Sequence, residues 1–272
     1  MSEARKNKIR AFYDTLFSAW GHQHWWPAQS RFEMIVGAYL TQNTSWTNVE
    51  KALRNLRKTK LLTLEGIRST PQSELESLIR SAGYFRQKAQ RLKTFVSFLD
   101  AHYGGSLVRM FARPTAELRE ELLALNGVGP ETADSILLYA GNHPVFVVDV
   151  YTRRIFERHQ IISTSSAYDA IRLLFEQSLR TALPLQQSFD TTLTEQIATS
   201  PPGSRHRPSR ISAAKRTALA QVFNEMHGLI VGVGKTHCLK SQPRCEQCPL
   251  QKFLPAGRVK DEVSHQPERT KP

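Results

Sequence analysis

Cysteine is scarce in this 272-residue chain, and long apolar runs are absent. No stretch approaches the roughly 20 apolar residues that span a bilayer, so no membrane partner is expected. The N-terminal MSEARKNKIR is charged rather than apolar, which argues against a signal peptide and favours a cytoplasmic location. The three cysteines lie between residues 238 and 248. An odd number packed so closely favours metal binding over disulfide bonds.

Acidic residues are outnumbered by basic ones, and the net charge is +13. Residues 1–60 carry ten Lys and Arg against four Asp and Glu, and residues 201–272 carry 13 against five. Residues 61–200 are nearly balanced, with 14 against 15. Such basic ends suit a polyanion such as nucleic acid. A surface that only keeps the protein in solution explains the same charge, so both interpretations remain open.

Apolar spacing is helical along most of the chain. The apolar run 145–150 could be a strand, but it is short and isolated, so we interpret it as a buried connection. The segment at about 185–213 is rich in Pro, Ser and Arg and is expected to be a flexible insertion. The tail, residues 256–272, is expected to be disordered and basic.

Two glycines flank Val128 in the segment LNGVGP, residues 125–130, between two predicted helices. Glycine tolerates positive φ and lets a ligand approach the backbone closely. The N–H groups of Gly127, Val128 and Gly129, at the start of the next helix, can hold a phosphate without reading sequence. An ordinary turn between helices has the same pattern, so the motif alone leaves both interpretations open.

Asp149 follows this hairpin within the apolar run VFVVDV. Ionising a carboxyl group among valines is costly unless N–H groups or a cation compensate. A helix that begins near Val150 would supply such N–H groups. Asp149 is therefore a candidate N-cap, a candidate catalytic carboxylate, or both.

Several segments occur in one characteristic order: LTQNTSW (40–46), GYFRQKAQRL (83–92), the hairpin, VVDV (147–150), HGLIVGVGKTHC (227–238) and the cysteines. Together they resemble the helix-hairpin-helix DNA glycosylases of the endonuclease III superfamily, over about residues 32–250. The resemblance implies an all-α, two-lobed fold with a C-terminal cysteine-cluster loop. Residues 31–140 would form a six-helix barrel lobe, and residues 1–30 with 141–255 the second lobe.

The resemblance implies a base-excision-repair enzyme that acts as a monomer on double-stranded DNA containing damaged bases. Such enzymes extrude a nucleotide and fill the gap with a side chain. Gln42 is the candidate gap-filler, although a polar residue at a helix end needs no such role. Gly83, Tyr84 and Lys88 match a segment that contacts the DNA backbone, although Lys88 could equally be a solvated surface charge.

By resemblance, Asp149 is catalytic in cleavage of the N-glycosidic bond. Members that also cleave the strand carry a nucleophilic lysine in the second hairpin helix, where this chain has Glu131. A carboxylate cannot form a Schiff base, so a monofunctional enzyme that uses water is expected. Glu131 is either a second active-site carboxylate or a favourable acid in the first turn of a helix.

All four tryptophans lie in the first 46 residues. Trp20 fits the apolar face of the first helix. Trp25, Trp26 and Trp46, with the hairpin sequence, resemble the 3-methyladenine DNA glycosylase III branch, which excises alkylated purines. We expect these three rings to line the base pocket, since π faces attract cationic, electron-poor bases. Packing as core or interface residues is the alternative.

Cys238, Cys245 and Cys248 match the first three ligands of the superfamily's [4Fe–4S] loop. The fourth cysteine would fall at residue 254, which is leucine. Three interpretations remain open: a cluster with a labile or non-cysteine fourth ligand such as His237, a different metal, or a loop that has lost its metal. The regular spacing favours iron–sulfur binding.

Two other functions fit the same sequence. One is an endonuclease III-like glycosylase and AP lyase that acts on other lesions through a different lysine. The other is a helix-hairpin-helix DNA-binding protein without enzymatic activity. Asp149 separates the enzymes from the binding protein, because only the enzymes require its carboxylate.

Overall fold

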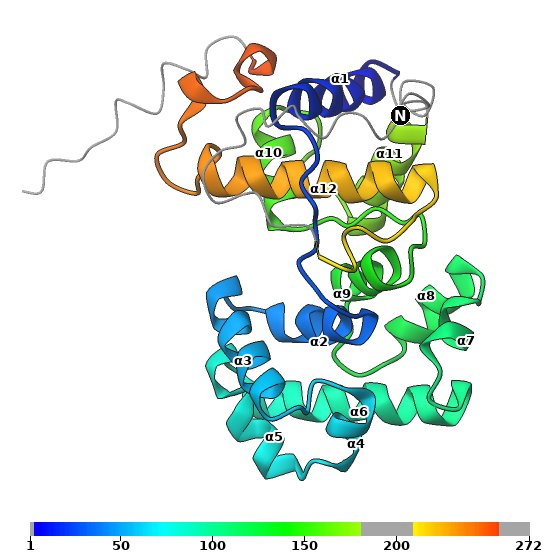
Figure 1. Cartoon of the computed structure of the whole chain (residues 1–272). Coiled ribbons are helices and arrows are strands. Elements are labelled where there is room, and N and C mark those ends of the chain that lie inside the picture. Colours follow the sequence, from blue (N-terminus) through cyan, green and yellow to red (C-terminus); the bar gives the residue numbers. More distant parts are fainter. Residues whose placement is uncertain (1–2, 181–208, 256–272) are drawn as a thin grey trace, which may run out of the picture. The chain divides into compact units, whose positions relative to one another are not determined.

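The computed structural model describes residues 3–180 and 209–255, and every regular element in those ranges is helical (Figure 1). This confirms the predicted all-α fold class. The insertion expected at 185–213 lies mostly outside the described residues, and the tail at 256–272 lies entirely outside them. No helix in the described ranges is long and apolar enough to cross a membrane.

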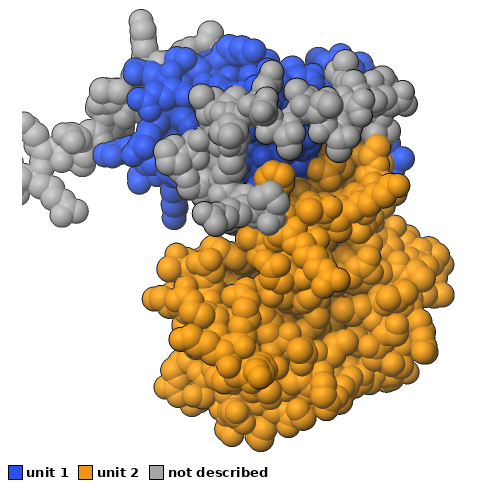
Figure 2. Space-filling model, viewed as in Figure 1, with its two compact units in different colours: residues 1–23, 148–206, 225–272 blue, residues 24–147, 207–224 orange. Residues whose placement is uncertain are grey.

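The chain divides into two compact units, coloured in Figure 2. One comprises residues 1–23, 148–206 and 225–272, and the other comprises residues 24–147 and 207–224. The lobe boundaries that the sequence predicted, near residues 30 and 140, remain a prediction. The second unit carries the hairpin, Gln42 and three tryptophans, and the first carries Asp149 and the cysteines.

The second unit is built around α2 (Arg31–Thr41), in which every residue from Phe32 to Leu40 is buried. A helix buried on all sides belongs in a core, and Glu33, its one buried charge, is paired with Arg57 at 2.5 Å. It packs against the other helices of this unit that contact it: α3 (Trp46–Lys58), α6 (Phe85–Tyr103), α9 (Pro130–Ser135) and the π-helical turn η2 (Ile136–Ala140). The remaining helices are α4 (Leu64–Ser69), α5 (Gln72–Leu78), η1 (Arg80–Ala82), α7 (Leu107–Phe111) and α8 (Thr115–Leu123).

The first unit comprises α1 (Glu3–Trp20), α10 (Val150–Arg158), α11 (Tyr168–Arg180) and the short turns η4 (Cys245–Gln247) and η5 (Gln251–Phe253). The ring of Phe12 is fully buried and lies 5.2 Å from Phe156, 4.8 Å from His159 and 4.7 Å from Phe253 between ring centroids. Aromatic packing therefore joins α1, α10 and η5. Helix α12 (Ala218–Thr236) contributes residues to both units.

The apolar run before Asp149 forms no strand, although residues 145–148 are all buried. This confirms the interpretation of a buried connection into a helix. Two short helices follow one another before α6: α5 ends at Leu78, and η1 spans Arg80–Ala82. Gly83 then adopts φ +66° and Tyr84 φ +43°, and α6 begins at Phe85.

Candidate active site and DNA interface

Asp149 is the N-cap of α10, as the sequence predicted. One carboxylate oxygen, Oδ1, accepts hydrogen bonds from Thr152 N at 2.7 Å and Thr152 Oγ1 at 2.9 Å. The Asp149 N–H in turn points at Thr152 Oγ1, which completes a capping box. The side chain is therefore fixed in direction by the helix that it caps.

The second oxygen of Asp149, Oδ2, lies 3.5 Å from Nε2 of His227 on α12. Both residues are buried. Burial by itself raises the pKa of Asp149, but His227 and the Thr152 donors outweigh it, and the pKa lies below its ordinary value. The carboxylate is thus ionised at neutral pH inside a low-dielectric site, where its charge acts most strongly.

The hairpin joins α8 to α9, and Gly127 is its sharpest point, with φ +78°. A Cβ at Gly127 would lie 1.9 Å from Arg91 Nε, so the glycine suits the positive φ and lets the Arg91 side chain pack against the turn. Gly129 is the N-cap of α9 in extended conformation, and Pro130 occupies the first helical position. Val128 N donates to Leu125 O at 3.1 Å and closes the turn.

Gln42, directly after α2, is held by the hairpin and by α6. Its amide nitrogen donates to Gly127 O at 2.9 Å and to Thr132 Oγ1 at 3.0 Å, and its oxygen accepts from Arg91 Nη1 at 2.6 Å. These partners fix which end of the amide faces which neighbour. Gln42 and the hairpin, 85 residues apart in sequence, therefore form one polar surface of this unit.

The resemblance grouped Gly83, Tyr84 and Lys88 as DNA contacts, but the structure exposes Tyr84 and buries Lys88. Tyr84 is 66% exposed in a left-handed conformation, and Gly83 has open space where a Cβ would be. Lys88 is 1% exposed, and its ammonium donates to Leu40 O and Ala82 O. The expectation that this ammonium meets the DNA backbone does not fit its burial.

The aromatic residues of the second unit form a cluster around Trp26. Its ring lies 5.1 Å from Trp46 in edge-to-face geometry, 5.4 Å from Tyr139 and 5.3 Å from Trp25. Trp25 and Trp26 are buried, whereas Trp46 is partly exposed. The three predicted tryptophans therefore belong to one cluster, which Tyr139 in the π-helical turn extends.

Glu131 lies in the first turn of α9 and is exposed. An acidic side chain there interacts favourably with the helix dipole. The residue is placed beside the Gly129 N-cap, on the hairpin itself. Its role as a second active-site carboxylate remains a prediction.

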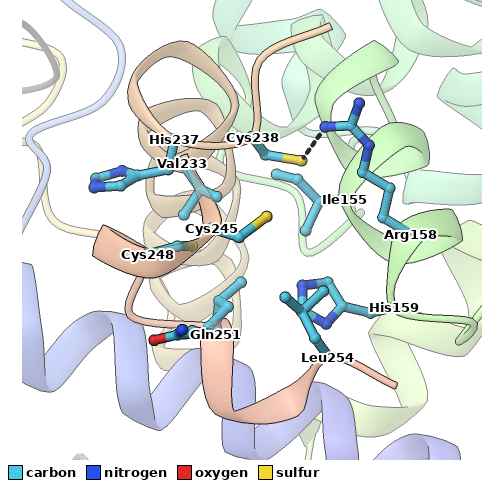
Figure 3. Close-up of a pocket in the computed structure, with 11 residues that line it drawn as sticks. Ile155, Arg158, His159, Val233, His237, Cys238, Cys245, Cys248, Gln251 and Leu254 are labelled. Atoms are coloured by element: carbon cyan, nitrogen blue, oxygen red, sulfur yellow. Dashed lines mark hydrogen bonds between the residues drawn. The ribbon is translucent and has the colours of Figure 1, made fainter. Parts of the chain in front are cut away.

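Cys238, Cys245 and Cys248 line a single pocket of the first unit (Figure 3). The sulfur atoms of Cys238 and Cys245 point into it, and Leu254 lines the same pocket. Arg158 anchors the loop through Nη1, which lies 3.2 Å from Cys238 Sγ and donates to Leu239 O at 2.7 Å. Burial raises the pKa of Cys248 to about 11, and the neighbouring thiols act in the same direction.

The residues of this pocket include three of the four cysteines that normally hold a [4Fe–4S] cluster. Three cysteines line the pocket, but residue 254, where the fourth cysteine would fall, has the hydrocarbon side chain of leucine. His237 points away from the sulfur atoms, donates to or accepts from Thr236 Oγ1 at 2.7 Å and stacks on Trp20. Within the described residues, no group of His, Cys, Asp and Glu is placed to hold a single metal ion.

Four residues of these sites were missed from the sequence. His227 was noted only within a motif, and Arg91, Thr132 and Tyr139 were not singled out. A histidine before glycine in an apolar helix gives a weak signal for a buried partner of a carboxylate. The others make contacts across 49 to 113 residues of sequence, which spacing along the chain cannot reveal.

Comparison with known proteins defines the class. Residues 36–181 match the family described as HhH-GPD superfamily base excision DNA repair protein. A protein of Methanocaldococcus jannaschii, provisionally named a DNA repair glycosylase, is 38% identical over 254 residues, covering 93% of this chain and 98% of the relative. The chain belongs to the HhH-GPD superfamily, as the motifs predicted, and is a DNA glycosylase of base excision repair.

Solved structures agree with this fold. The 3-methyladenine DNA glycosylase of Helicobacter pylori, bound to 1,N6-ethenoadenine, is 28% identical, with a TM-score of 0.64 over 85% of this chain and 97% of that chain. An endonuclease III trapped covalently on DNA has a TM-score of 0.67 at 22% identity, over 93% of this chain and 97% of that chain. At that identity the second likeness concerns the fold alone.

Proposed function

We propose that the protein is a monofunctional glycosylase that hydrolyses the N-glycosidic bond of alkylated purines, 3-methyladenine-like bases among them, in double-stranded DNA. The observation that carries the proposal is Asp149, a buried carboxylate kept ionised by His227 and the N-terminus of α10. Such a group stabilises positive charge that develops on the sugar, or activates the water that attacks it.

Each part of the proposed site has a separate role in binding DNA or in the reaction. The hairpin would hold phosphate through the backbone N–H groups of Gly127 and Gly129, while the Val128 N–H closes the turn by donating to Leu125 O. Gln42 would occupy the gap left by the extruded base. Water supplies the oxygen that replaces the base on the sugar. The cationic base takes the electron pair of the N-glycosidic bond and leaves as a neutral purine, and the proton lost by the water passes to solvent. Glu131 cannot form an imine, so this chemistry leaves the strand intact.

The aromatic cluster supports the substrate class. Alkylation makes a purine cationic, and π faces attract a desolvated cation by about 2 kcal/mol. Trp46 is the partly exposed ring of this cluster, and the buried rings of Trp26 and Tyr139 pack behind it within one unit. The Helicobacter pylori relative at 28% identity binds an ethenoadenine, which is also a modified purine.

The test is a panel of duplexes, each with one defined lesion, incubated with the protein and then analysed with and without alkali. We expect base release from alkylated purines, with strand breaks only after alkali. Asp149→Asn keeps a residue that caps helices well, so it removes the charge and little stability. We expect it to slow release by about 10²–10⁴-fold.

Asp169→Asn is the matched control, because Asp169 is an exposed acid in the first turn of α11 of the same unit. Unchanged release by Asp149→Asn would contradict the role of Asp149. Absence of release from every duplex would instead favour a DNA-binding protein without enzymatic activity.

An AP lyase that uses another lysine is the second candidate, and Lys235 is the observation that favours it. Lys235 lies in the last turn of α12, and partial desolvation lowers its pKa although the charge of Asp149 acts to raise it. A lowered pKa makes a lysine a better nucleophile. Borohydride trapping of the unmodified protein on DNA, lost in Lys235→Met, would establish this activity and overturn the monofunctional proposal.

For the cofactor, we propose iron–sulfur binding by Cys238, Cys245 and Cys248. A cluster there would tie the loop to α12 through three thiolates. The fourth ligand of such a cluster would not be a cysteine of this loop, because residue 254 is leucine. Iron and sulfide assays on anaerobically purified protein test this binding, and stoichiometric absence of both would contradict it.

A further inference from the structure

Lys88 is a buried lysine whose ammonium joins two backbone segments. Its ammonium is buried and donates to Leu40 O at 2.9 Å and to Ala82 O at 2.7 Å. Removing a charge from water is costly, and carbonyl dipoles offset the cost only in part. Burial accordingly lowers the pKa of Lys88 to about 8, with Arg91 acting in the same direction. A methionine would fill similar space without that cost, but it would leave Leu40 O and Ala82 O without this donor.

The two acceptors belong to the two segments that carry the candidate DNA contacts. Leu40 lies in the last turn of α2, two residues before Gln42. Ala82 ends η1 and directly precedes Gly83 and Tyr84, the left-handed turn that begins α6. One ammonium thus connects the end of α2 to the turn before α6, and both partners are backbone atoms that move with their segments.

We propose that Lys88 is a positioning residue, which holds the Gln42 segment and the Gly83–Tyr84 turn at a fixed separation so that both meet the DNA together. Its effect on catalysis rests on the proposed function, whereas the connection itself is a property of the fold. Lys88 touches no DNA in this proposal. Loss of the connection lets either segment shift, and a displacement of about 1 Å can slow a reaction about 10²-fold.

Lys93 provides a matched control on the same helix. Its ammonium also donates to two backbone carbonyls, those of Arg68 and Thr70 at the end of α4. Lys93→Met therefore removes the same kind of interaction at a place that carries no candidate DNA contact. Lys93 is half-buried, so comparing Lys88→Met with Lys93→Met separates positioning of the DNA-binding segments from the loss of a lysine–carbonyl contact elsewhere on α6.

The experiment combines hydrogen exchange of the DNA-free protein with single-turnover base release from an alkylated-purine duplex. Lys88→Met should speed exchange in peptides covering residues 40–45 and 82–86 together, and slow release about 10²-fold. Lys93→Met should speed exchange only near residues 68–72 and release base at the wild-type rate.

Unchanged exchange in either of the two segments of Lys88→Met would overturn the proposal. So would an equal loss of base release in Lys93→Met, or wild-type release by Lys88→Met. If the wild-type protein releases no base from any duplex, the proposed function fails, and the exchange measurement alone still supports or overturns the connection made by Lys88.

Discussion

Two carboxylates of this protein have contrasting surroundings. Asp149 is buried, caps α10 and faces His227, so its charge is both fixed in direction and poorly solvated. Glu131 is exposed in the first turn of α9, where a negative charge is favourable but weakly directed. The first environment suits electrostatic catalysis, and the second tolerates substitution.

On the proposed monofunctional mechanism, Glu131→Lys should add a lyase activity. A lysine at this position places an amine where related bifunctional enzymes have their nucleophile, so a Schiff base with the sugar can form. Borohydride should then trap a covalent protein–DNA adduct. Glu131→Gln is the control, since it removes the charge without adding an amine, and an adduct with Glu131→Gln would contradict this explanation.

Single residues also mark the limit of sequence reasoning. The N-cap role of Asp149 depends on local sequence, because both the apolar run before it and the helix after it are visible in the sequence. The burial of Lys88 was not predicted, because its acceptors lie 48 and six residues away. A lysine in an amphipathic helix gives no sign of which carbonyl groups tertiary packing will bring near it.

At the scale of elements, Trp46 at the start of α3 is the partly exposed member of the aromatic cluster. Trp46→Ala should reduce release of cationic alkylated purines about tenfold or more, because base stacking contributes about 1–3 kcal/mol per base. Repeating the comparison on the same duplex with a neutral purine lesion shows how much of the reduction in release depends on the charge of the base. Equal release by Trp46→Ala and wild type would place Trp46 outside the base pocket.

The cysteine loop gives a second prediction at this scale. Leu254→Cys should increase bound iron and sulfide and make the cluster more resistant to air, because four thiolates hold all four corners of a [4Fe–4S] cluster. Absorbance and iron content after timed exposure to air provide the measurement. Leu254→Ser is the control for lost packing, and equal retention in the serine variant would contradict the ligand explanation.

At the scale of the whole molecule, a net charge of +13 predicts salt-sensitive DNA binding. The logarithm of the binding constant for an undamaged duplex should fall linearly with the logarithm of the salt concentration. The slope should be about −0.9 for each phosphate that the protein contacts. Arg86, 82% exposed beside Asn126 on an open hollow of α6, should contribute about one such contact, so Arg86→Ala lowers the slope by about 1.

Arg109 serves as the control, since it is exposed on α7 after the opposite end of α6. Arg109→Ala removes the same charge, and its salt slope should match that of the wild type. Equal reductions in both variants would mean that the phosphate contacts are spread over this unit rather than gathered beside the hairpin.

The sequence by itself determined the all-α class, the superfamily, the hairpin and the N-cap at Asp149, because these depend on apolar periodicity, glycine conformation and motifs a few residues long. The roles assigned to the site residues remain predictions. Only the tertiary structure decided that Gln42 bonds Arg91 and the hairpin, that His227 faces Asp149, and that Lys88 joins two distant segments. Those contacts depend on how helices pack, and packing brings together residues whose spacing along the chain carries no signal.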